Sequence, residues 1–383
     1  MAAEERPYQR CTRTIMDTTD PDIWFDEDGV SSHAIRFDEV FAADLRRAQR
    51  GERREELEQL VATIKDAGRG KQYDCVIGVS GGVDSTYLTL QAVRLGLRPL
   101  LVHFDSGWNS ELAVGNIHSL VTSLNLDLYT HVVDWREMKD LQLAFFKASL
   151  ANCDIPTDHA FGYVAYTQAR KYGIRYILSG GNAATESVLP ESWGYNASDA
   201  RHLKAVHKRF GTRKLETYPV MGMFKRHVWY PMVLGVKTVR PLNFMPYFVE
   251  DAKKDIAENV GWRDYGGKHY ESVFTRYFQG YYLPHKFGYD KRLAHYSSLI
   301  LSGQLTRDEA LALMETTNYP LDLRTQDHEF IAKKLGVSVA ELEAICAQPP
   351  VDYTAYPSSA RFWGAIGRVR SFLRRAAGAS SRV

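Results

Sequence analysis

The sequence of 383 residues has little cysteine and no long apolar run. Its four cysteines, Cys11, Cys75, Cys153 and Cys346, lie far apart, which argues against a disulfide scaffold and favours a reducing, cytoplasmic location. The N-terminus lacks the apolar core of a signal peptide, and no segment approaches the roughly 20 apolar residues that span a bilayer. Lys and Arg (48) nearly balance Asp and Glu (46), so the overall charge does not predict a nucleic-acid partner. Any acidic ligand must therefore be held locally.

Apolar runs alternate with amphipathic segments from residue 75 to about 182. The runs CVIGV, PLLVHF, LYTHVV and YILSG are typical of buried strands, and the segments between them have helical periodicity. This pattern predicts an α/β fold with a doubly wound parallel sheet that helices cover on both faces. The sequence further predicts four parts: an irregular N-terminal segment (1–52), the α/β domain (53–247), a mostly helical region (248–347), and a linker with a basic tail (348–383).

The stretch SGGVDS at residues 80–85 lies where the first strand is expected to become a helix. Gly81 and Gly82 permit a tight turn and a close approach of the backbone to a ligand, and a helix N-terminus attracts anions. The spacing is neither that of a Walker loop nor GxGxxG. Hydroxyls of Ser80 and Ser85 can donate to phosphate oxygens, and Asp84 beside a polyphosphate implies Mg²⁺ between them.

This loop resembles the pyrophosphate loop (PP-loop) of the N-type ATP pyrophosphatases, which cleave ATP between the α and β phosphates. The resemblance implies that residues 80–85 hold the phosphates that leave, and that His103, Phe104 and Asp105 lie along the adenine. It also implies that a later strand end approaches the α-phosphate with Ser179, Gly180, Gly181 and Asn182, and that Glu186 is a second Mg²⁺ ligand.

Four further segments resemble the WbpG/PseA-like N-acetyl sugar amidotransferases of bacterial surface-polysaccharide biosynthesis: 154–161, 178–193, 261–292 and 294–311. The resemblance implies that ATP activates the carbonyl oxygen of an N-acetyl group on a nucleotide-linked sugar, and that ammonia replaces this oxygen to give an acetamidino group. It also implies a partner glutaminase resembling the histidine-pathway enzyme, often with a cyclase-like subunit, because no cysteine here has the context of a glutaminase nucleophile.

Candidate catalytic residues come from the block 261–292, in which cations alternate with aromatic residues. Such a mixture can bind phosphates and stack on a base or a sugar. Within the block the family match favours Lys268, His269, Glu271 and Arg276. Asp158 and His159 are candidates for general acid and base, since attack by ammonia requires removal of a proton. Asp84 completes the catalytic set.

The N-terminal segment departs from the family, whose members carry C-x2-C, sixteen residues and C-x2-C, a spacing typical of structural zinc. The corresponding positions here are Cys11, Thr14, Ser31 and Ala34. Only one thiolate is left, so we expect no zinc.

Two other functions stay open at this stage: a PP-loop enzyme that modifies tRNA, and an inactive assembly protein that recruits a glutaminase. The near-neutral charge disfavours the first, and the intact SGGVDS disfavours the second. The tail also has two interpretations. Its apolar residues at helical spacing, such as Phe362 and Ile366, lie among arginines, so it either contacts an anionic membrane surface or a partner, or is disordered.

Overall fold

The computed structural model describes residues 6–267, 270–317, 319–360 and 362. Five strands form a single parallel sheet, with the order β3-β2-β1-β4-β5. The strands are β1 (Cys75–Gly78), β2 (Pro99–Asp105), β3 (Leu128–Val132), β4 (Tyr176–Leu178) and β5 (Lys237–Val239). In register, Cys75 of the central strand β1 faces Pro99 on one side and Tyr176 on the other. The carboxyl ends of β1, β2 and β4 therefore meet at one edge of the sheet.

Helices cover both faces of the sheet, because successive side chains of a strand point to opposite sides. Cys75 and Ile77 pack with α3 (Arg54–Ala67), α4 (Val83–Arg94), α5 (Glu111–Leu124) and α10 (Val249–Val260). Val76 packs on the other face with α6 (Trp135–Lys147) and α7 (Ile155–Lys171). The predicted α/β fold with a doubly wound parallel sheet is confirmed. The sequence did not indicate α6 or the short edge strand β5.

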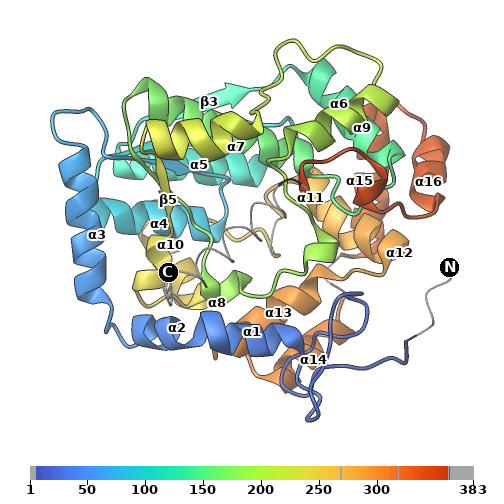
Figure 1. Cartoon of the computed structure of the whole chain (residues 1–383), viewed down its shortest axis with the longest axis horizontal. Helices are drawn as coiled ribbons and strands as arrows, with labels where there is room; N and C mark the ends of the chain where they lie inside the picture. The colour runs from blue at the N-terminus through green and yellow to red at the C-terminus, as the bar shows by residue number, and fades with distance from the viewer. Residues whose placement is uncertain (1–5, 268–269, 318, 361, 363–383) are drawn as a thin grey trace.

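The remaining elements pack around this α/β core (Figure 1). Between β4 and α10 they are α8 (Ala183–Glu186), η1 (Glu191–Trp193), α9 (Ala200–Phe210), η2 (Lys225–Val233) and η3 (Pro241–Phe244). The helical region continues with α11 (Val273–Tyr277), η4 (Phe278–Tyr282), α12 (Leu283–Phe287), α13 (Lys291–Leu301), α14 (Arg307–Glu315), α15 (Leu321–Leu335) and α16 (Val339–Ala347), and η5 (Tyr353–Ala355) follows. Side chains at their first turns stabilise several of these helices. Thr306 with Glu309, and Ser338 with Glu341, form capping boxes at α14 and α16.

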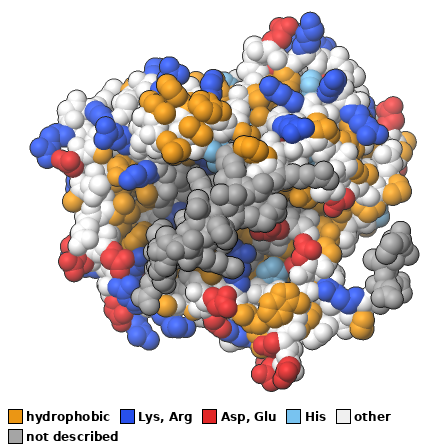
Figure 2. All heavy atoms as spheres, viewed as in Figure 1, with side chains coloured by type: hydrophobic (Ala, Val, Ile, Leu, Met, Phe, Trp, Pro, Cys, Tyr) orange, Lys and Arg blue, Asp and Glu red, His pale blue; other side chains and the backbone are white. Residues whose placement is uncertain are grey.

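The prediction of an irregular N-terminal segment is wrong for residues 32–49, which form α1 (Ser32–Val40), capped by Ser31, and α2 (Ala42–Gln49). The segment lies against the C-terminal helices, and in Figure 1 these blue helices run beside the orange α13 and α14. Ile15, Met16 and Ile23 share a small core with Leu293 and Ala310. Charged side chains of both signs surround these N-terminal helices (Figure 2).

Residues 348–359, which their composition predicts to be a linker, also pack on the core. Tyr356 is buried and donates a hydrogen bond to the Ala148 carbonyl, and Val351 N–H donates to the Ser149 carbonyl. No helix in the described part of the chain is long and apolar enough to cross a membrane.

Candidate functional site

The SGGVDS loop joins β1 to α4 in a conformation that requires glycine. Gly81 has φ of +85°, and a Cβ atom added to it would lie 2.6 Å from the Ala113 carbonyl oxygen. The Gly81 carbonyl accepts a hydrogen bond of 2.9 Å from Trp262 Nε1, which anchors the loop to the segment after α10. The loop is therefore packed on both sides, and its backbone path is fixed by contacts with distant residues.

The loop presents donors toward a cavity. Gly82 is the N-cap of α4, so the amides of Val83, Asp84 and Ser85 lie in the first turn, where no intrahelical acceptor exists. Ser80 Oγ accepts a hydrogen bond from Gly82 N–H, and Ser85 Oγ donates to the Gly82 carbonyl. These amides and hydroxyls, together with the partial positive charge of the helix end, can bind an anion.

Asp84 is held by two side chains from other elements. Asn182 Nδ2 donates a hydrogen bond of 3.0 Å to Asp84 Oδ1, and the Tyr247 hydroxyl donates one of 2.5 Å to the same oxygen. Asn182 is itself fixed because its Oδ1 caps α8 by accepting from Thr185 N–H. Burial and the charge of Asp84 raise the pKa of Tyr247 well above its ordinary value, so Tyr247 remains a donor. Sequence reasoning found Asp84 and Asn182 but missed Tyr247.

The cavity in front of the loop, here called the phosphate cavity, has a volume of about 380 Å³. Predicted residues that line it are Ser80, Gly82, Asp84, Ser85, Gly180, Gly181, Glu186 and Glu271. Gly181 lies so close to Glu186 that an added Cβ atom would be 3.3 Å from Glu186 Oε2. The structure thus brings together the ends of β1 and β4, as the parallel sheet predicts.

The described residues that line the phosphate cavity carry mainly negative charge. Four carboxylates line it, from Asp84, Glu186, Asp264 and Glu271, whereas Lys253 is the one lysine or arginine among its described lining residues. Lys253 Nζ lies 3.1 Å from both Glu250 Oε1 and Asp264 Oδ2. Burial lowers the pKa of Lys253, but these two contacts outweigh it and raise the pKa, so the lysine stays charged. A polyphosphate would be repelled here unless cations accompanied it.

The carboxylate oxygens of this cavity are the hard ligands that Mg²⁺ prefers. Among the described residues, no three His, Cys, Asp or Glu side chains converge as a complete metal site. Asp84 and Glu186 both line the cavity, and Mg²⁺ usually takes one or two carboxylates and completes its shell with waters and substrate phosphates. Asp84 and Glu186 suit this role.

A second cavity of about 390 Å³, here called the base cavity, lies beyond the ends of β1 and β2 and shares Ser80 and Glu271 with the phosphate cavity. Aromatic side chains that line it are Phe104, Trp193, Phe161 and Phe278. His103 also lines it. His103 Nδ1 donates to the Val79 carbonyl at 2.8 Å, because Nε2 accepts from Asn109 Nδ2 at 3.0 Å. Both ring nitrogens of His103 are therefore hydrogen-bonded, which fixes the orientation of the ring.

Asp105 and Asp158 differ in their access to this base cavity. Asp158 lines it. Asp105 instead accepts hydrogen bonds from Gly107 N–H and Asn109 Nδ2, and is not among the residues that line the base cavity. Asp105 therefore shapes the turn after β2, and the contact with adenine that the resemblance implies for it has no geometric support.

His159 does not suit the predicted role in acid–base catalysis. It is 2% exposed, and its Nδ1 donates to the Ala197 carbonyl while its Nε2 accepts from Met221 N–H. Burial lowers its pKa, so the ring is neutral. The ring joins α7 to the 197 and 221 segments. Acid–base catalysis by His159 is therefore not supported, because both ring nitrogens already form hydrogen bonds with the backbone.

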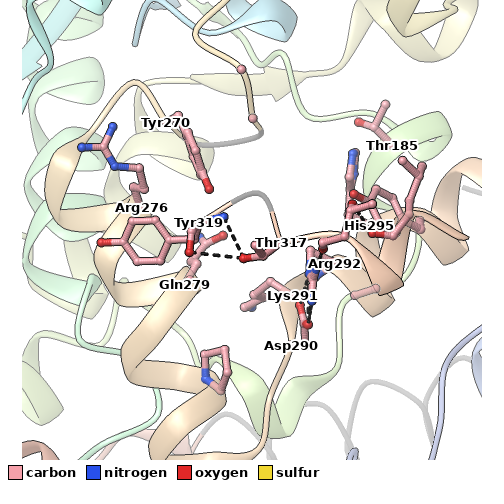
Figure 3. A pocket seen from close by; sticks show the side chains of 18 of the residues that line it. Thr185, Tyr270, Arg276, Gln279, Asp290, Lys291, Arg292, His295, Thr317 and Tyr319 are labelled. Carbon is pink, nitrogen blue, oxygen red and sulfur yellow. Dashed lines mark hydrogen bonds and ion pairs between the residues drawn. The ribbon is translucent and has the colours of Figure 1, made fainter. Parts of the chain in front are cut away.

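A third cavity of about 520 Å³, here called the substrate cavity, lies in the C-terminal helical region (Figure 3). Figure 3 shows Tyr270, Arg276 and Tyr319 on one side of it and Lys291, Arg292 and His295 on the other. The substrate cavity meets the phosphate cavity, since the two share Thr185, Glu186, Gly266, Gly267 and His295.

Arg276, a predicted site residue, lines the substrate cavity but is held firmly. Its Nε and one terminal nitrogen each lie 2.7 Å from the carboxylate of Asp327, which also accepts from the Tyr319 hydroxyl at 2.8 Å. The sequence gave no signal for Asp327 or Tyr319, because these partners come from a region more than 40 residues later in the chain. Lys268 and His269 lie outside the described residues.

The degenerate zinc positions still converge in the fold. Cys11 Sγ accepts hydrogen bonds from Thr14 N–H (3.3 Å) and Ser31 N–H (3.2 Å), and Ser31 Oγ accepts from Ala34 N–H. Burial raises the pKa of Cys11, but the hydrogen bonds from Ser31 and Thr14 outweigh it and bring the pKa below its ordinary value. Packing and backbone hydrogen bonds therefore hold this turn in place.

Comparisons with known proteins locate one family in this chain. Residues 271–370 match the model of the C-terminal domain of WbpG-like LPS biosynthesis proteins, which confirms the resemblance predicted from the sequence. No curated protein matches the chain. Among solved structures, NMN synthetase from Francisella tularensis is 17% identical and covers 59% of this chain and 92% of its own, with a TM-score of 0.28.

Proposed function

We propose, from the WbpG-like C-terminal domain that residues 271–370 carry, that this chain is an ATP-dependent amidotransferase of bacterial surface-polysaccharide biosynthesis. The carbonyl oxygen of an N-acetyl group on a nucleotide-linked sugar attacks the α-phosphorus of ATP, and pyrophosphate leaves. Ammonia then adds to the activated carbon, AMP leaves with the oxygen, and one proton is released. The product is an acetamidino sugar.

The observation that carries this proposal is the junction of the substrate cavity with the phosphate cavity. Most of the substrate cavity is built from the family-matched region, and it opens onto the loop through Glu186 and His295. A sugar bound there would reach the phosphates of a nucleotide bound at the loop. Catalysis of this kind depends mainly on positioning and on neutralising charge.

ATP fits the other two cavities. The base cavity offers aromatic faces and the oriented His103, and the phosphate cavity offers the first-turn amides of α4 with the hydroxyls of Ser80 and Ser85. Ser80 and Glu271 line both cavities, so the α-phosphate would lie where the base cavity meets the phosphate cavity. Bound Mg²⁺, held by Asp84 and Glu186, would offset the charge of the leaving pyrophosphate.

Residues of the substrate cavity suit a phosphorylated sugar. Lys291 supplies positive charge, as does Arg292, whose guanidinium is held by Asp290 at 2.7 Å. Tyr270 and Tyr319 supply surfaces for a base or a sugar ring. Because Asp327 fixes the fork of Arg276, that guanidinium would orient a substrate group with little loss of side-chain entropy on binding.

Ammonia must come from elsewhere. Burial raises the pKa of Cys75, Cys153 and Cys346, which keeps these thiols protonated. Cys11 has a lowered pKa, but it is fully buried and its sulfur accepts two backbone hydrogen bonds, so none of the four suits the nucleophile of a glutaminase. This supports the expectation of a partner glutaminase, with a cyclase-like subunit, that delivers ammonia in the cytoplasm.

The test is to incubate the protein with ATP, Mg²⁺, ammonium at alkaline pH and a panel of UDP- and CMP-linked N-acetyl sugars, and to measure AMP together with the sugar mass. AMP and a sugar about one mass unit lighter, from NH in place of O, would support the proposal. Asp84→Asn should abolish both. The matched control is Asp255→Asn, a carboxylate on α10 that pairs with Arg94, and it should retain activity. If no sugar yields AMP while Asp84→Asn binds a glutaminase as well as wild type does, an assembly role replaces catalysis.

A further inference from the structure

Positive charge is concentrated in one segment of this nearly neutral chain. Residues 200–249 contain ten Lys or Arg and a single acidic residue, Glu216, whereas the whole chain has 48 basic and 46 acidic residues. The formal charge of this segment is therefore +9, and the rest of the chain is net negative. Overall composition hides this asymmetry.

Most of these cations reach solvent. On α9, Arg201, Lys204 and Lys208 recur at helical spacing opposite the buried Leu203 and Val206, and all three are exposed. Arg213 and Lys214 are exposed just after the helix. Figure 2 shows blue side chains gathered over the place of α9 at the upper right of this face.

An exposed apolar surface belongs to the same segment. Four large side chains of the 224–233 stretch face solvent: Phe224 is 66% exposed, Trp229 39%, Met232 72% and Val233 56%. In Figure 2 orange side chains gather over the yellow element that Figure 1 draws in front of α7, on the same face as the basic group. We call Phe224, Trp229, Met232 and Val233 the apolar ridge.

The element that carries the apolar ridge is packed on α7, so the fold itself keeps the ridge exposed. Tyr230 is buried, and its ring centroid lies 4.9 Å from that of Tyr166 on α7. The Arg226 guanidinium lies 4.4 Å from the centroid of the same Tyr166 ring. These contacts fix η2 on α7 with the ridge outward and Lys225 exposed beside it.

We propose that this surface, the apolar ridge with the cations of α9 and the turn that follows it, binds the anionic face of a phospholipid membrane. Aromatic and thioether side chains insert at the boundary between headgroups and acyl chains, and nearby Lys and Arg bind anionic headgroups. This combination of Trp, Phe and Met with excess positive charge is typical of proteins that adsorb to membranes.

The apolar ridge favours a membrane over RNA, which is also a polyanion, as the partner of this surface. A nucleic-acid surface needs cations and stacking faces, whereas Met232 and Val233, exposed by 72% and 56%, gain nothing from a phosphate backbone. Insertion into lipid removes such side chains from water and is favourable. This inference is independent of the proposed reaction.

The test is co-sedimentation of the full chain with vesicles of phosphatidylglycerol and phosphatidylcholine, and with vesicles of phosphatidylcholine alone. Wild type should bind only the anionic vesicles, and added salt should weaken binding. Met232→Ser with Val233→Ser should weaken binding by about tenfold or more. Arg213→Gln with Lys214→Gln should weaken it roughly fivefold per charge.

Matched control substitutions outside the proposed membrane-binding surface show whether any exposed apolar or cationic side chain contributes to vesicle binding. Leu321→Ser removes an apolar side chain of similar exposure (62%) on α15, and Lys65→Gln removes an exposed cation on α3; both should bind as wild type does. The basic tail is tested by Arg374→Gln with Arg375→Gln. If wild type ignores anionic vesicles, if it prefers RNA, or if only the tail variant loses binding, the proposal is overturned.

Discussion

The Tyr247 hydroxyl donates a hydrogen bond of 2.5 Å to Asp84 Oδ1, although 163 residues separate the two in sequence. Asn182 donates to the same oxygen. Asp84 thus has a fixed orientation toward the phosphate cavity, set by the strand end after β4 and by the segment before α10.

Tyr247→Phe should therefore impair AMP formation. Loss of a hydrogen bond to a charged group costs about 1.5 to 3 kcal/mol, which corresponds to roughly tenfold to a hundredfold in rate. We also expect a higher Mg²⁺ concentration for half-maximal activity, which a purely structural role would not produce. Tyr73→Phe, which removes a hydroxyl that donates to Asp127, is the control. A Tyr247→Phe enzyme with normal rate and Mg²⁺ dependence would contradict this role.

Gly81 and Gly51 allow a matched test of the loop. Both have positive φ, +85° and +73°, but only Gly81 would place a Cβ atom against backbone, whereas Gly51 has nothing within 4 Å. Gly51→Ala should cost about 1 to 2 kcal/mol of unfolding free energy and leave nucleotide binding unchanged. Gly81→Ala should cost more and abolish ATP binding, as denaturant unfolding and calorimetry would measure. Equal effects of the two substitutions would refute a special role for Gly81.

Lys253 and Lys254 are adjacent on α10, but their side chains point to different surroundings. Lys253 lines the phosphate cavity, and Lys254 is 74% exposed at the side chain. Because Lys253 is the one lysine among the described residues that line the phosphate cavity, Lys253→Gln should raise the KM for ATP about tenfold, the effect of a charge-assisted contact. Lys254→Gln should not change it. Steady-state kinetics at saturating sugar would decide, and equal KM values for the two variants would exclude a phosphate contact.

His159 should prove structural. His159→Ala leaves the Ala197 carbonyl and the Met221 N–H without their partner, so we expect a loss of about 2 kcal/mol or more in unfolding free energy. AMP formation per folded molecule should stay near the wild-type value. Thermal melting combined with kinetics at low temperature tests both points. A fully stable but inactive variant would restore the acid–base interpretation.

Stability should fall in acid because of Glu137. Burial alone would raise its pKa, but hydrogen bonds from Thr217 and Tyr218 outweigh burial and lower it below its ordinary value of 4.5. The ionised carboxylate therefore stabilises the fold above about pH 4.5, and this contribution is lost as the pH falls through the lower folded value.

Glu137→Gln should accordingly be less stable than wild type at neutral pH, and the difference should shrink below pH 4.5. The exposed Glu39→Gln serves as the control in the same melting series. A stability difference that does not change with pH would show that packing, and not charge, explains the effect.

The sequence by itself determined four of the five strands, β1 to β4, and the position of the loop. Buried strands with continuous apolar runs and the glycines of SGGVDS are local signals, so β1, α4 and the likeness to the WbpG-like domain could be read directly. The resemblance to the PP-loop enzymes placed residues 80–85 and Asn182 around one nucleotide, and the pairing of β1 with β4 does bring Asn182 to Asp84.

Only the tertiary structure decided which side chains act together. Tyr247 on Asp84, Asp327 on Arg276, and the backbone partners of His159 join residues that are far apart in sequence, and no local pattern encodes such contacts. The same holds for the apolar ridge, since only the fold shows that Tyr230 is buried while Met232 faces solvent. Periodicity reports how often a residue type recurs along one element, whereas burial and hydrogen bonding depend on what other elements pack against it.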